Sequence, residues 1–418
     1  MVERFKPFYN NIMLYAKSVG KWLLISAVVG ILGGLLGTAF HMGVEYATGL
    51  RGKFPFIIWF LPICGLVITA IYQCLRTQGV GTNAVIDAVH NGEKIPILLI
   101  PAIFISTILT HLCGGSAGRE GAALQIGGDL GKHIANVFSL DDKDTRMATL
   151  CGMSALFSAL FGTPLTATLF ALEVISVGVI YFAGLLPCLF ASLVAYEVSV
   201  LLGVAPTRFA VTAPEATAFN LAMTAVLALC CAMVCIVFCV AMRKTDELTE
   251  KYIPNGYLRA FIGGCIIIAL TYAVGCRDYN GAGMNIISAA ITDGTAKPEA
   301  FILKIIFTAV TLGFGFKGGE VVPTFFVGAV FGCVMGPVLG LPSGFAAALG
   351  LVSLFCGAVN CPISSMVLSI ELFGADGLIC FAVACVVSYV FSGYRGLYSS
   401  QTILYSKLRA EFINIHTK

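Results

Sequence analysis

Glycine-rich segments carry the residues with the most chemical potential in this sequence. Three of them combine glycines with the restart of a helix, namely Gly79-Val-Gly-Thr-Asn83, Gly118-Arg-Glu-Gly121 and Gly318-Gly-Glu-Val-Val-Pro323. A helix that begins there leaves unpaired N–H groups at its N-terminus, and that end carries about half a positive charge. Such termini bind anions without a formal cation, so a small anion can be held in a low dielectric and still leave. The segments predict a path for a small anion.

Two of these segments contain a glutamate, Glu120 and Glu320. A charged carboxylate can itself occupy an anion position, whereas a protonated one loses that attraction and can swing aside. Placing a charge at the bilayer centre costs about 2.5–3.5 kcal/mol on insertion scales, so such a residue usually has a purpose. We therefore predict that Glu120 is a gate. The alternative is that Glu120 only caps its helix or pairs with Arg119.

The composition places these segments in a membrane. Of 418 residues, 58% are hydrophobic and 11% charged, and the mean hydropathy is +0.93, which excludes a soluble globular protein. Some apolar runs are short or interrupted by Gly and Pro, which is typical of helices that break where their backbone lines a cavity. We predict an all-α polytopic (multi-pass) membrane protein, a transporter or channel. The long apolar runs lie near residues 22–48, 55–74, 95–113, 180–203, 218–242, 259–275, 301–314, 324–341 and 376–393.

Several other classes are disfavoured. A net charge of +3 without a basic, aromatic-interleaved patch argues against nucleic acid as a partner. The sixteen Cys are scattered through apolar segments and the five His are dispersed, so we expect neither a metal site nor a cofactor. A membrane hydrolase would need a nucleophile with a base, and Ser116 has only His111, five residues earlier and off its helix face. We therefore expect no enzymatic activity.

An internal repeat is visible in the sequence. The stretch Cys151–Glu173 aligns without gaps with Leu349–Glu371, which pairs Pro164 with Pro362 and Glu173 with Glu371. A nearly equal offset, 200 residues, pairs Glu120 with Glu320. The symmetric positions of Glu173 and Glu371 at the ends of repeated helices predict a scaffold role.

The repeat predicts the domain organisation. We expect a single membrane domain, 1–418, with a first repeat over 20–215, a second over 216–405 and no C-terminal cytoplasmic domain. An odd number of crossings per half would invert the repeats and bring their broken helices to a shared site at the midplane. The hydrophilic stretch 243–259 is interpreted as a solvated loop or helix end.

Charge near the termini predicts orientation. The first apolar run has no small-residue cleavage site after it, so it is not a removable signal peptide. Positive residues at both ends favour a cytoplasmic location for both termini of a plasma (inner) membrane protein. These residues are Arg4, Lys6, Lys17, Lys21, Lys407, Arg409 and Lys418.

Four motifs together resemble the CLC family of chloride channels and proton-coupled anion antiporters. They are a G-x-G helix start, GREG before an apolar helix, a GG-x-x-x-P segment 200 residues later, and a late tyrosine in GYRGLYSSQ (393–401). The resemblance covers about 20–405. It implies a CLC-type fold with two inverted-topology repeats and broken membrane helices, and a homodimer in the lipid bilayer in which each subunit has its own anion path.

The resemblance also implies roles for residues. Glu120 would be the gating glutamate, with Glu320 as a second gating or proton residue. Tyr398 would be the central tyrosine, and Val80 stands where chloride-selective members place a serine. The residues implied to bind the anion are Gly79, Val80, Gly81, Thr82, Asn83, Gly118, Arg119, Gly121, Gly319, Val321, Val322 and Tyr398.

The departures from the chloride pattern concern selectivity. Chloride-coupled antiporters carry a second glutamate where this chain has Val174, and the segment Gly315–Glu320 is similar to the fluoride branch, whose members exchange fluoride for protons. That branch has methionine at the place of Val80 and threonine at that of Val322. We expect a fluoride/proton antiporter that exports fluoride; a chloride channel or chloride/proton antiporter of the same family is the alternative.

Some polar residues keep two interpretations. Lys317 either offsets the charge of Glu320 or extends to a membrane interface. Arg119 either anchors local carbonyls or touches the ion. Thr82 and Asn83 either cap a helix or donate to the anion.

Overall fold

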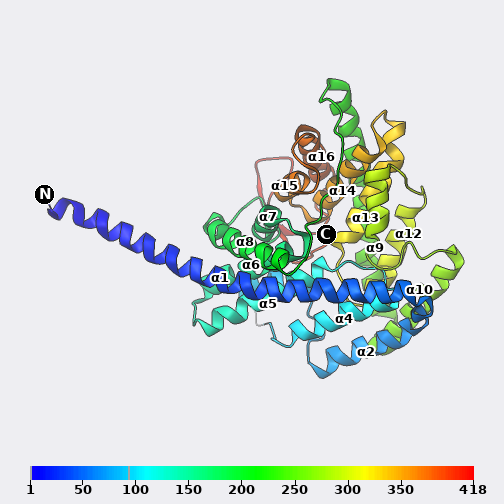
Figure 1. The fold of residues 1–418 in the computed structure, drawn as a ribbon, viewed down its shortest axis with the longest axis horizontal. Coiled ribbons are helices and arrows are strands. Elements are labelled where there is room, and N and C mark those ends of the chain that lie inside the picture. Colours follow the sequence, from blue (N-terminus) through cyan, green and yellow to red (C-terminus); the bar gives the residue numbers. More distant parts are fainter. Residues whose placement is uncertain (1, 93–94) are drawn as a thin grey trace.

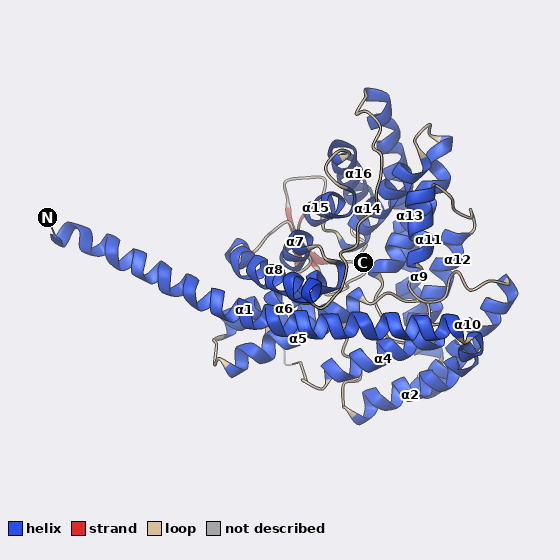
Figure 2. Cartoon of the chain, viewed as in Figure 1, coloured by secondary structure: helices blue, strands red, loops and turns tan. Residues whose placement is uncertain are grey.

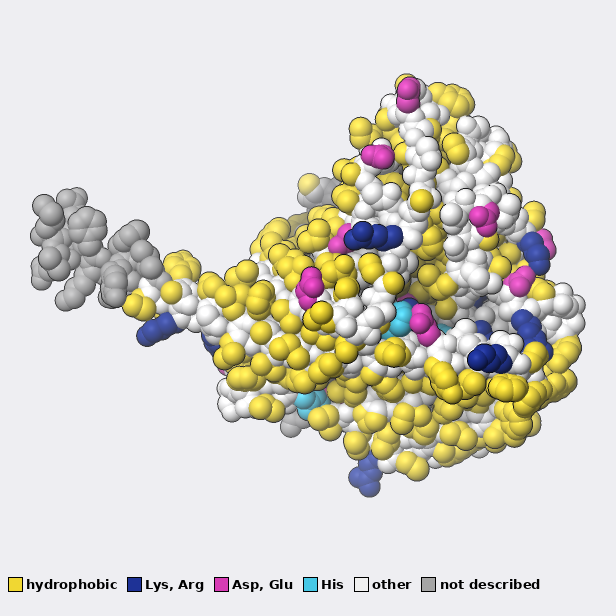
Figure 3. Space-filling model, viewed as in Figure 1, with side chains coloured by type: hydrophobic (Ala, Val, Ile, Leu, Met, Phe, Trp, Pro, Cys, Tyr) yellow, Lys and Arg dark blue, Asp and Glu magenta, His cyan; other side chains and the backbone are white. Residues whose placement is uncertain are grey.

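The computed structural model describes residues 2–92 and 95–418, and most of them lie in helices (Figures 1 and 2). Helices dominate because the bilayer offers no water to the backbone, so each apolar run must satisfy its own N–H and C=O groups. The longest helix, α1 (Val2–Lys53), projects from the body at its N-terminal end. Hydrophobic side chains spread widely over α1 and the helices beneath it, as expected of a surface that faces lipid (Figure 3).

The nine predicted apolar runs all coincide with helices, but not all of these helices are long. Within the described residues, six are long and apolar enough to cross a membrane: Met13–Lys53, Pro55–Cys74, Phe182–Leu201, Ala218–Tyr252, Gly256–Val274 and Val321–Val338. The runs near 95–113, 301–314 and 376–393 form helices of 15, 14 and 14 residues. A crossing needs about 20 residues, so these three are too short to span alone.

The elements of the first part of the chain follow α1 in a fixed order. They are η1 (Pro55–Phe60), α2 (Leu61–Cys74), α3 (Thr82–Asn91), α4 (Leu99–Cys113), α5 (Glu120–Val137), α6 (Asp142–Phe161), α7 (Pro164–Glu173), β1 (Ser176–Val177), η2 (Phe182–Gly184) and α8 (Leu185–Leu201).

The second part repeats this order. Its elements are α9 (Ala218–Tyr252), α10 (Gly256–Val274), α11 (Met284–Ser288), the π-helix η3 (Ala289–Asp293), α12 (Ala300–Gly313), α13 (Val321–Val338), α14 (Ser343–Val359), α15 (Pro362–Phe373) and α16 (Leu378–Phe391). As α1 contacts α4, α6 and α8, so α9 contacts α12, α14 and α16. The two parts meet where α2 contacts α10, α7 contacts α15 and α5 contacts α13.

Paired glycines let the central helices touch at the backbone. A Cβ added at Gly127 in α5 would lie 2.3 Å from the carbonyl oxygen of Gly152 in α6. The same relation holds in the second part, where a Cβ at Gly328 in α13 would lie 2.3 Å from the Gly350 oxygen in α14. Both contacts require glycine, and small residues at such crossings are typical of membrane helices.

An aromatic cluster fills the junction of the two parts. The ring of Phe325 in α13 lies 5.8 Å from that of Phe161 in α6 and 5.2 Å from that of Phe355 in α14. Phe170 in α7 lies 5.7 Å from Phe355. These buried rings hold the central helices, and hence the segments between them, in one arrangement.

A small sheet was not predicted. β1 pairs in parallel with β2 (Thr402–Tyr405), which pairs antiparallel with β3 (Phe412–His416). Ser176 is the register partner of Thr402, so the sheet ties the end of α7 to the chain that follows the Tyr398 loop. The two residues of β1 show no alternation that a sequence pattern could reveal.

Candidate functional site

The two glycine-rich segments around Glu120 and Glu320 lie against each other. The N–H of Gly118 donates to the oxygen of Gly319 at 2.7 Å, and the N–H of Gly319 donates to the oxygen of Gly118 at 2.8 Å. A Cβ at Gly319 would lie 2.4 Å from the Gly121 nitrogen, so only glycine permits this approach. The bridge places the N-termini of α5 and α13 side by side, and their unpaired amides converge.

The side chain of Glu120 lies where the starts of α5 and α13 meet. It is the first residue of α5, and its side chain is 1% exposed. Its Oε2 accepts from the backbone N–H of Arg119 at 2.9 Å, and the backbone amide of Val322 in α13 also stabilises the charged carboxylate. The Nε of Arg119 lies 3.8 Å from Oε1. The carboxylate thus sits on amides of both parts of the chain, in the kind of position that binds an anion.

Glu320 has the opposite surroundings. It is the N-cap residue of α13, and its Oε2 is buried without a hydrogen-bond partner among the described residues. A Cβ at Gly121 would lie 3.1 Å from that oxygen, so the side chain faces the first turn of α5. A buried carboxyl oxygen without a partner is costly, which makes Glu320 a candidate for proton or ion exchange.

The predicted equivalence of Glu120 and Glu320 is wrong by one position. The N-cap residues are Arg119 for α5 and Glu320 for α13, and the bridged glycines, Gly118 and Gly319, are 201 residues apart rather than 200. The sequence alignment matched the two glutamates because they are the same residue type. The helices that they precede or begin are offset by one residue more, since α5 begins at Glu120 and α13 at Val321. In the structure, Glu320 corresponds to Arg119.

A cavity of about 450 Å³ opens beside Glu320. It lies between the start of α3, the middle of α5, the end of α9, the end of α12 and the Tyr398 loop. Of the predicted site residues it contains Val80, Gly81, Thr82, Asn83, Glu320 and Tyr398. Gly79 lines a neighbouring cavity of about 280 Å³, and the remaining predicted residues, Gly118, Arg119, Glu120, Gly121, Gly319, Val321 and Val322, lie at the bridged helix starts behind it.

Tyr398 is held at this cavity by its backbone. Its carbonyl oxygen accepts from Thr417 Oγ1 at 2.5 Å and from the N–H of Gln401 at 3.0 Å, and the preceding Leu397 N–H donates to Ala358 at 2.9 Å. The side chain is 2% exposed, and its hydroxyl has no hydrogen-bond partner among the described residues. A fixed, free O–H donor beside a cavity suits an anion.

Thr82 and Asn83 do not cap a helix. The N-cap residue of α3 is Gly81, and no side chain caps the N-terminus of this helix. Thr82 Oγ1 instead accepts from Gln125 Nε2 at 3.0 Å, and Asn83 Oδ1 accepts from the N–H of Ser400 at 3.2 Å. The capping interpretation is wrong because both side chains find partners in distant segments.

Sequence reasoning missed several residues that line the cavity, among them four with amide or charged side chains. Gln125 is the one polar side chain in the run Gly121–Gly128 of α5, a signal that could have identified it. Arg243, Asp246 and Glu247 lie in the stretch interpreted as a solvated loop or helix end. The helix end is confirmed, because α9 continues to Tyr252, but its charged side chains also face the cavity.

Glu173 and Glu371 each cap the start of a helix in the other repeat. Glu173 lies at the end of α7. It accepts hydrogen bonds at 3.1 and 2.9 Å from the N–H groups of Ile363 and Ser364, which lie in the first turn of α15. Glu371 in α15 likewise accepts from Leu165 and Thr166 at the start of α7, at 3.0 and 2.8 Å. These reciprocal caps confirm the scaffold role of the pair.

Arg119 and Lys317 both point into the protein. The Arg119 guanidinium forms an ion pair with Glu120. Among the described residues, no carbonyl oxygen accepts a hydrogen bond from this guanidinium, so Arg119 does not anchor local carbonyls. The Nζ of Lys317 lies 4.6 Å from the ring centroid of Tyr72, and the side chain lines both cavities. Lys317 therefore does not extend to a membrane interface.

The residues considered for hydrolysis are not paired. Ser116 Oγ lies 3.1 Å from Thr308 Oγ1, and His111 Nδ1 is hydrogen-bonded to the Thr107 oxygen at 2.9 Å. A nucleophile and base would have to contact each other. Among residues 13–92 and 95–418, whose side chains the structure describes, no three His, Cys, Asp or Glu side chains are grouped to hold a metal ion.

Comparison with known proteins gives consistent relatives. The family model described as "Voltage gated chloride channel" matches residues 64–393. A protein named "Chloride/fluoride channel protein" from Pseudomonas syringae pv. tomato is 35% identical over 398 residues, which cover 93% of this chain and 88% of that protein.

Solved structures agree with this relationship. The crystal structure of a CLC-type fluoride/proton antiporter superposes with a TM-score of 0.88 at 33% identity and covers 91% of this chain and 98% of that one. That of a slow cyanobacterial Cl⁻/H⁺ antiporter has a TM-score of 0.75 at 19% identity, with coverage of 89% and 94%, and supports the fold alone. The helices, the bridged segments and these matches lead to one conclusion: this multi-pass membrane protein has the CLC fold and belongs to the voltage-gated chloride channel family, whose members are channels and transporters.

Proposed function

We propose that this protein is a secondary anion transporter that exports fluoride in exchange for protons. The observation that carries the proposal is the position of Glu120, whose carboxylate rests on backbone amides of both α5 and α13. Beside it, Glu320 and Tyr398 line one cavity, and each has a buried polar atom with no hydrogen-bond partner in the described part of the chain. The names of a 35% identical relative and of a 33% identical structure support fluoride and proton coupling.

The gate follows from competition for the same amides. While Glu120 is charged, it takes the place that an anion would occupy, because N–H dipoles at two helix starts attract either one. A proton on the carboxylate removes that attraction, and the side chain can leave the amides to a fluoride ion. Proton binding and anion binding at Glu120 are thereby linked, which is the requirement for exchange.

Fluoride places particular demands on such a site. It is small and strongly hydrated, so a site that replaces its water needs close N–H or O–H donors. The amides from Arg119 to Gly121 and from Glu320 to Val322 are donors of this kind, together with the Tyr398 hydroxyl, which has no partner among the described residues. Fluoride also enters cells as neutral HF from acid surroundings, so its export against a gradient needs coupling to inward proton flow.

The wider assignment follows the same proposal. Glu120 and Glu320 are the gating and proton residues, and the anion contacts are those predicted above, from Gly79 to Asn83, at Gly118, Arg119 and Gly121, at Gly319, Val321 and Val322, and at Tyr398. The repeats 20–215 and 216–405 have inverted topology, both termini lie in the cytoplasm, and the protein forms a homodimer in the plasma (inner) membrane. Its role is transport rather than catalysis.

A flux measurement tests the proposal. Purified protein is reconstituted in liposomes loaded with fluoride or with chloride, and ion and pH electrodes follow both species. We expect fluoride to leave faster than chloride and protons to move in the opposite direction. Chloride efflux at least as fast as fluoride efflux would overturn the selectivity, and fluoride efflux without proton movement would make the protein a channel.

The second candidate is chloride transport or conduction by the same site. It is favoured by Val80 and Val322, which differ from the methionine and threonine expected in the fluoride branch. Neither valine offers a side-chain donor, so selectivity would rest on the backbone amides and Tyr398. The chloride arm of the flux measurement decides between the candidates.

A further inference from the structure

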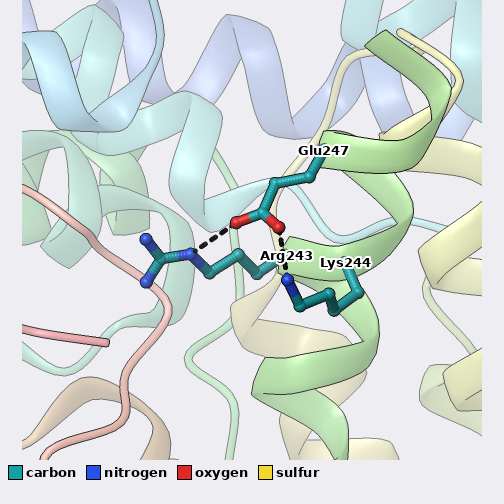
Figure 4. A network of polar contacts seen from close by, with 3 residues as sticks. All are labelled: Arg243, Lys244 and Glu247. Atoms are coloured by element: carbon teal, nitrogen blue, oxygen red, sulfur yellow. Dashed lines mark hydrogen bonds and ion pairs between the residues drawn. The ribbon is translucent and has the colours of Figure 1, made fainter. Parts of the chain in front are cut away.

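The last turns of α9 bring three acidic residues to the edge of the 450 Å³ cavity or next to it: Asp246, Glu247 and Glu250. Two of them are already paired. Glu247 accepts from Arg243 Nε at 3.1 Å and from Lys244 Nζ at 2.7 Å, so each carboxylate oxygen has a cationic partner (Figure 4). Glu250 forms an ion pair with Arg259 at 3.5 Å.

Asp246 differs from both neighbours. Within the described part of the chain its carboxylate has no hydrogen bond or ion pair, and it is exposed both to solvent and to the cavity that Glu320 lines. Its backbone is fixed, because Thr249 Oγ1 donates to the oxygen of Gly313 and a Cβ on Gly313 would lie 3.2 Å from the Asp246 nitrogen. An unpaired carboxylate on a fixed helix end can gain and lose a proton without breaking a contact.

Charges from three directions act on Asp246. Lys317, from the loop before α13, attracts it and also acts on Glu320. Arg259 attracts it from α10, while Glu250 and Glu247 repel it from its own helix. The Lys317 ammonium is thus shared electrostatically by the two carboxylates at the cavity, which limits the cost of moving a charge from one to the other.

The far end of the cavity supplies the second carboxyl group. Glu320 Oε2 and the Tyr398 hydroxyl are buried there without hydrogen-bond partners among the described residues, and Tyr398 is 2% exposed. A polar cavity of this size holds several waters, which need such partners. Water in the cavity therefore connects two carboxyl groups, one buried and one in contact with solvent.

We propose that Asp246 transfers protons between Glu320 and the cytoplasmic solution, an inference that rests on the proposed exchange of fluoride for protons. In the inward direction, the Glu320 carboxyl O–H gives its proton to a cavity water, and that water gives a proton to an Asp246 carboxylate oxygen. Asp246 then releases the proton to bulk water and is again an anion. Fluoride leaves by its own contacts and does not need Asp246.

The test compares Asp246→Asn with Glu247→Gln, a matched control one residue away, in fluoride-loaded liposomes followed with fluoride and pH electrodes. We expect Asp246→Asn to slow proton movement by about 10-fold, as much as the loss of Glu320 itself, because Asp246 acts only through Glu320. The proton-to-fluoride ratio should change with it. Glu247→Gln should keep the wild-type ratio, and Asp246→Glu should restore proton movement.

Three results would overturn the inference. They are a wild-type ratio and rate in Asp246→Asn, an equal loss of coupling in Glu247→Gln, and a loss of both fluxes in Asp246→Asn that Asp246→Glu does not restore. Failure of the proposed function is seen separately, because wild-type protein would then move fluoride without protons, or chloride in its place, in the same experiment.

Discussion

The starts of α5 and α13 show how two similar backbones can use a carboxylate in different ways. Both helices follow a bridged glycine, Gly118 or Gly319, and both begin at the junction of the two parts. Glu120 is bound by amides and lies near Arg119, whereas Glu320 leaves one oxygen without a partner at a cavity. In the proposed mechanism, the first arrangement is a closed gate, and the second leaves a group free to exchange protons with water.

A shift of one residue produces this difference. Glu120 is the first helical residue of α5, so its side chain can turn back onto the Arg119 amide. Glu320 occupies the N-cap of α13, where Arg119 stands in α5, and the cation that acts on it is Lys317. The sign of the residue at the N-cap therefore distinguishes the two helix starts.

Removing the charge of Glu120 should have the largest effect. Glu120→Gln keeps the size of the side chain but cannot ionise, so proton movement coupled to fluoride should fall by about 100-fold. Paired fluoride and pH electrodes on liposomes measure it. The control is the thermal unfolding of the variant in detergent, which should stay close to that of the wild type; coupling that survives the change would contradict the gate.

Removing the charge of Glu320 should have a smaller effect. Glu320→Gln should slow coupled proton movement by about 10-fold or more, because water in the cavity can still reach Glu120 when the gate moves. Since Oε2 has no partner to lose, the unfolding temperature should not fall. A drop in stability without a change in coupling would show that Glu320 is structural and that the contrast with Glu120 is wrong.

The reciprocal helix caps made by Glu173 and Glu371 are a symmetric pair of glutamates, which can be compared with the asymmetric pair Glu120 and Glu320. Glu173→Gln and Glu371→Gln should each lower the free energy of unfolding by about 1 kcal/mol, as expected when a helix cap is weakened, with less for the more exposed Glu371. Thermal unfolding in detergent measures the loss. The proton-to-fluoride ratio should stay at the wild-type value, and a changed ratio would assign the pair to the proton path.

The smallest effect concerns Tyr398. Tyr398→Phe removes a hydroxyl that has no hydrogen-bond partner among the residues described, so stability should change by less than about 0.5 kcal/mol. If the hydroxyl contacts fluoride, the fluoride KM should rise by about threefold, while coupling through Glu120 and Glu320 continues. An unchanged KM, measured from initial efflux rates, would remove Tyr398 from the anion site.

Much of the fold could be predicted because membrane helices follow from local composition. Each of the nine apolar runs became a helix, and the glycine-rich segments became the breaks between them. The bounds of the short helices and the two-residue strand β1 could not be predicted, because tertiary contacts rather than local pattern set them. The same limit explains the wrong pairing of Glu120 with Glu320.

By itself, the sequence determined that the chain spans a membrane and that Glu120 and Glu320 are acids in apolar surroundings at helix starts. Hydropathy and glycine positions are properties of neighbouring residues, so they can be read locally. The tertiary structure alone decided the Gly118–Gly319 bridge and the presence of Asp246 at the cavity of Glu320. It also decided the helix caps made by Glu173 and Glu371, whose partners lie 190 to 206 residues away in the sequence. These depend on where distant helices meet, which packing sets and no local pattern encodes.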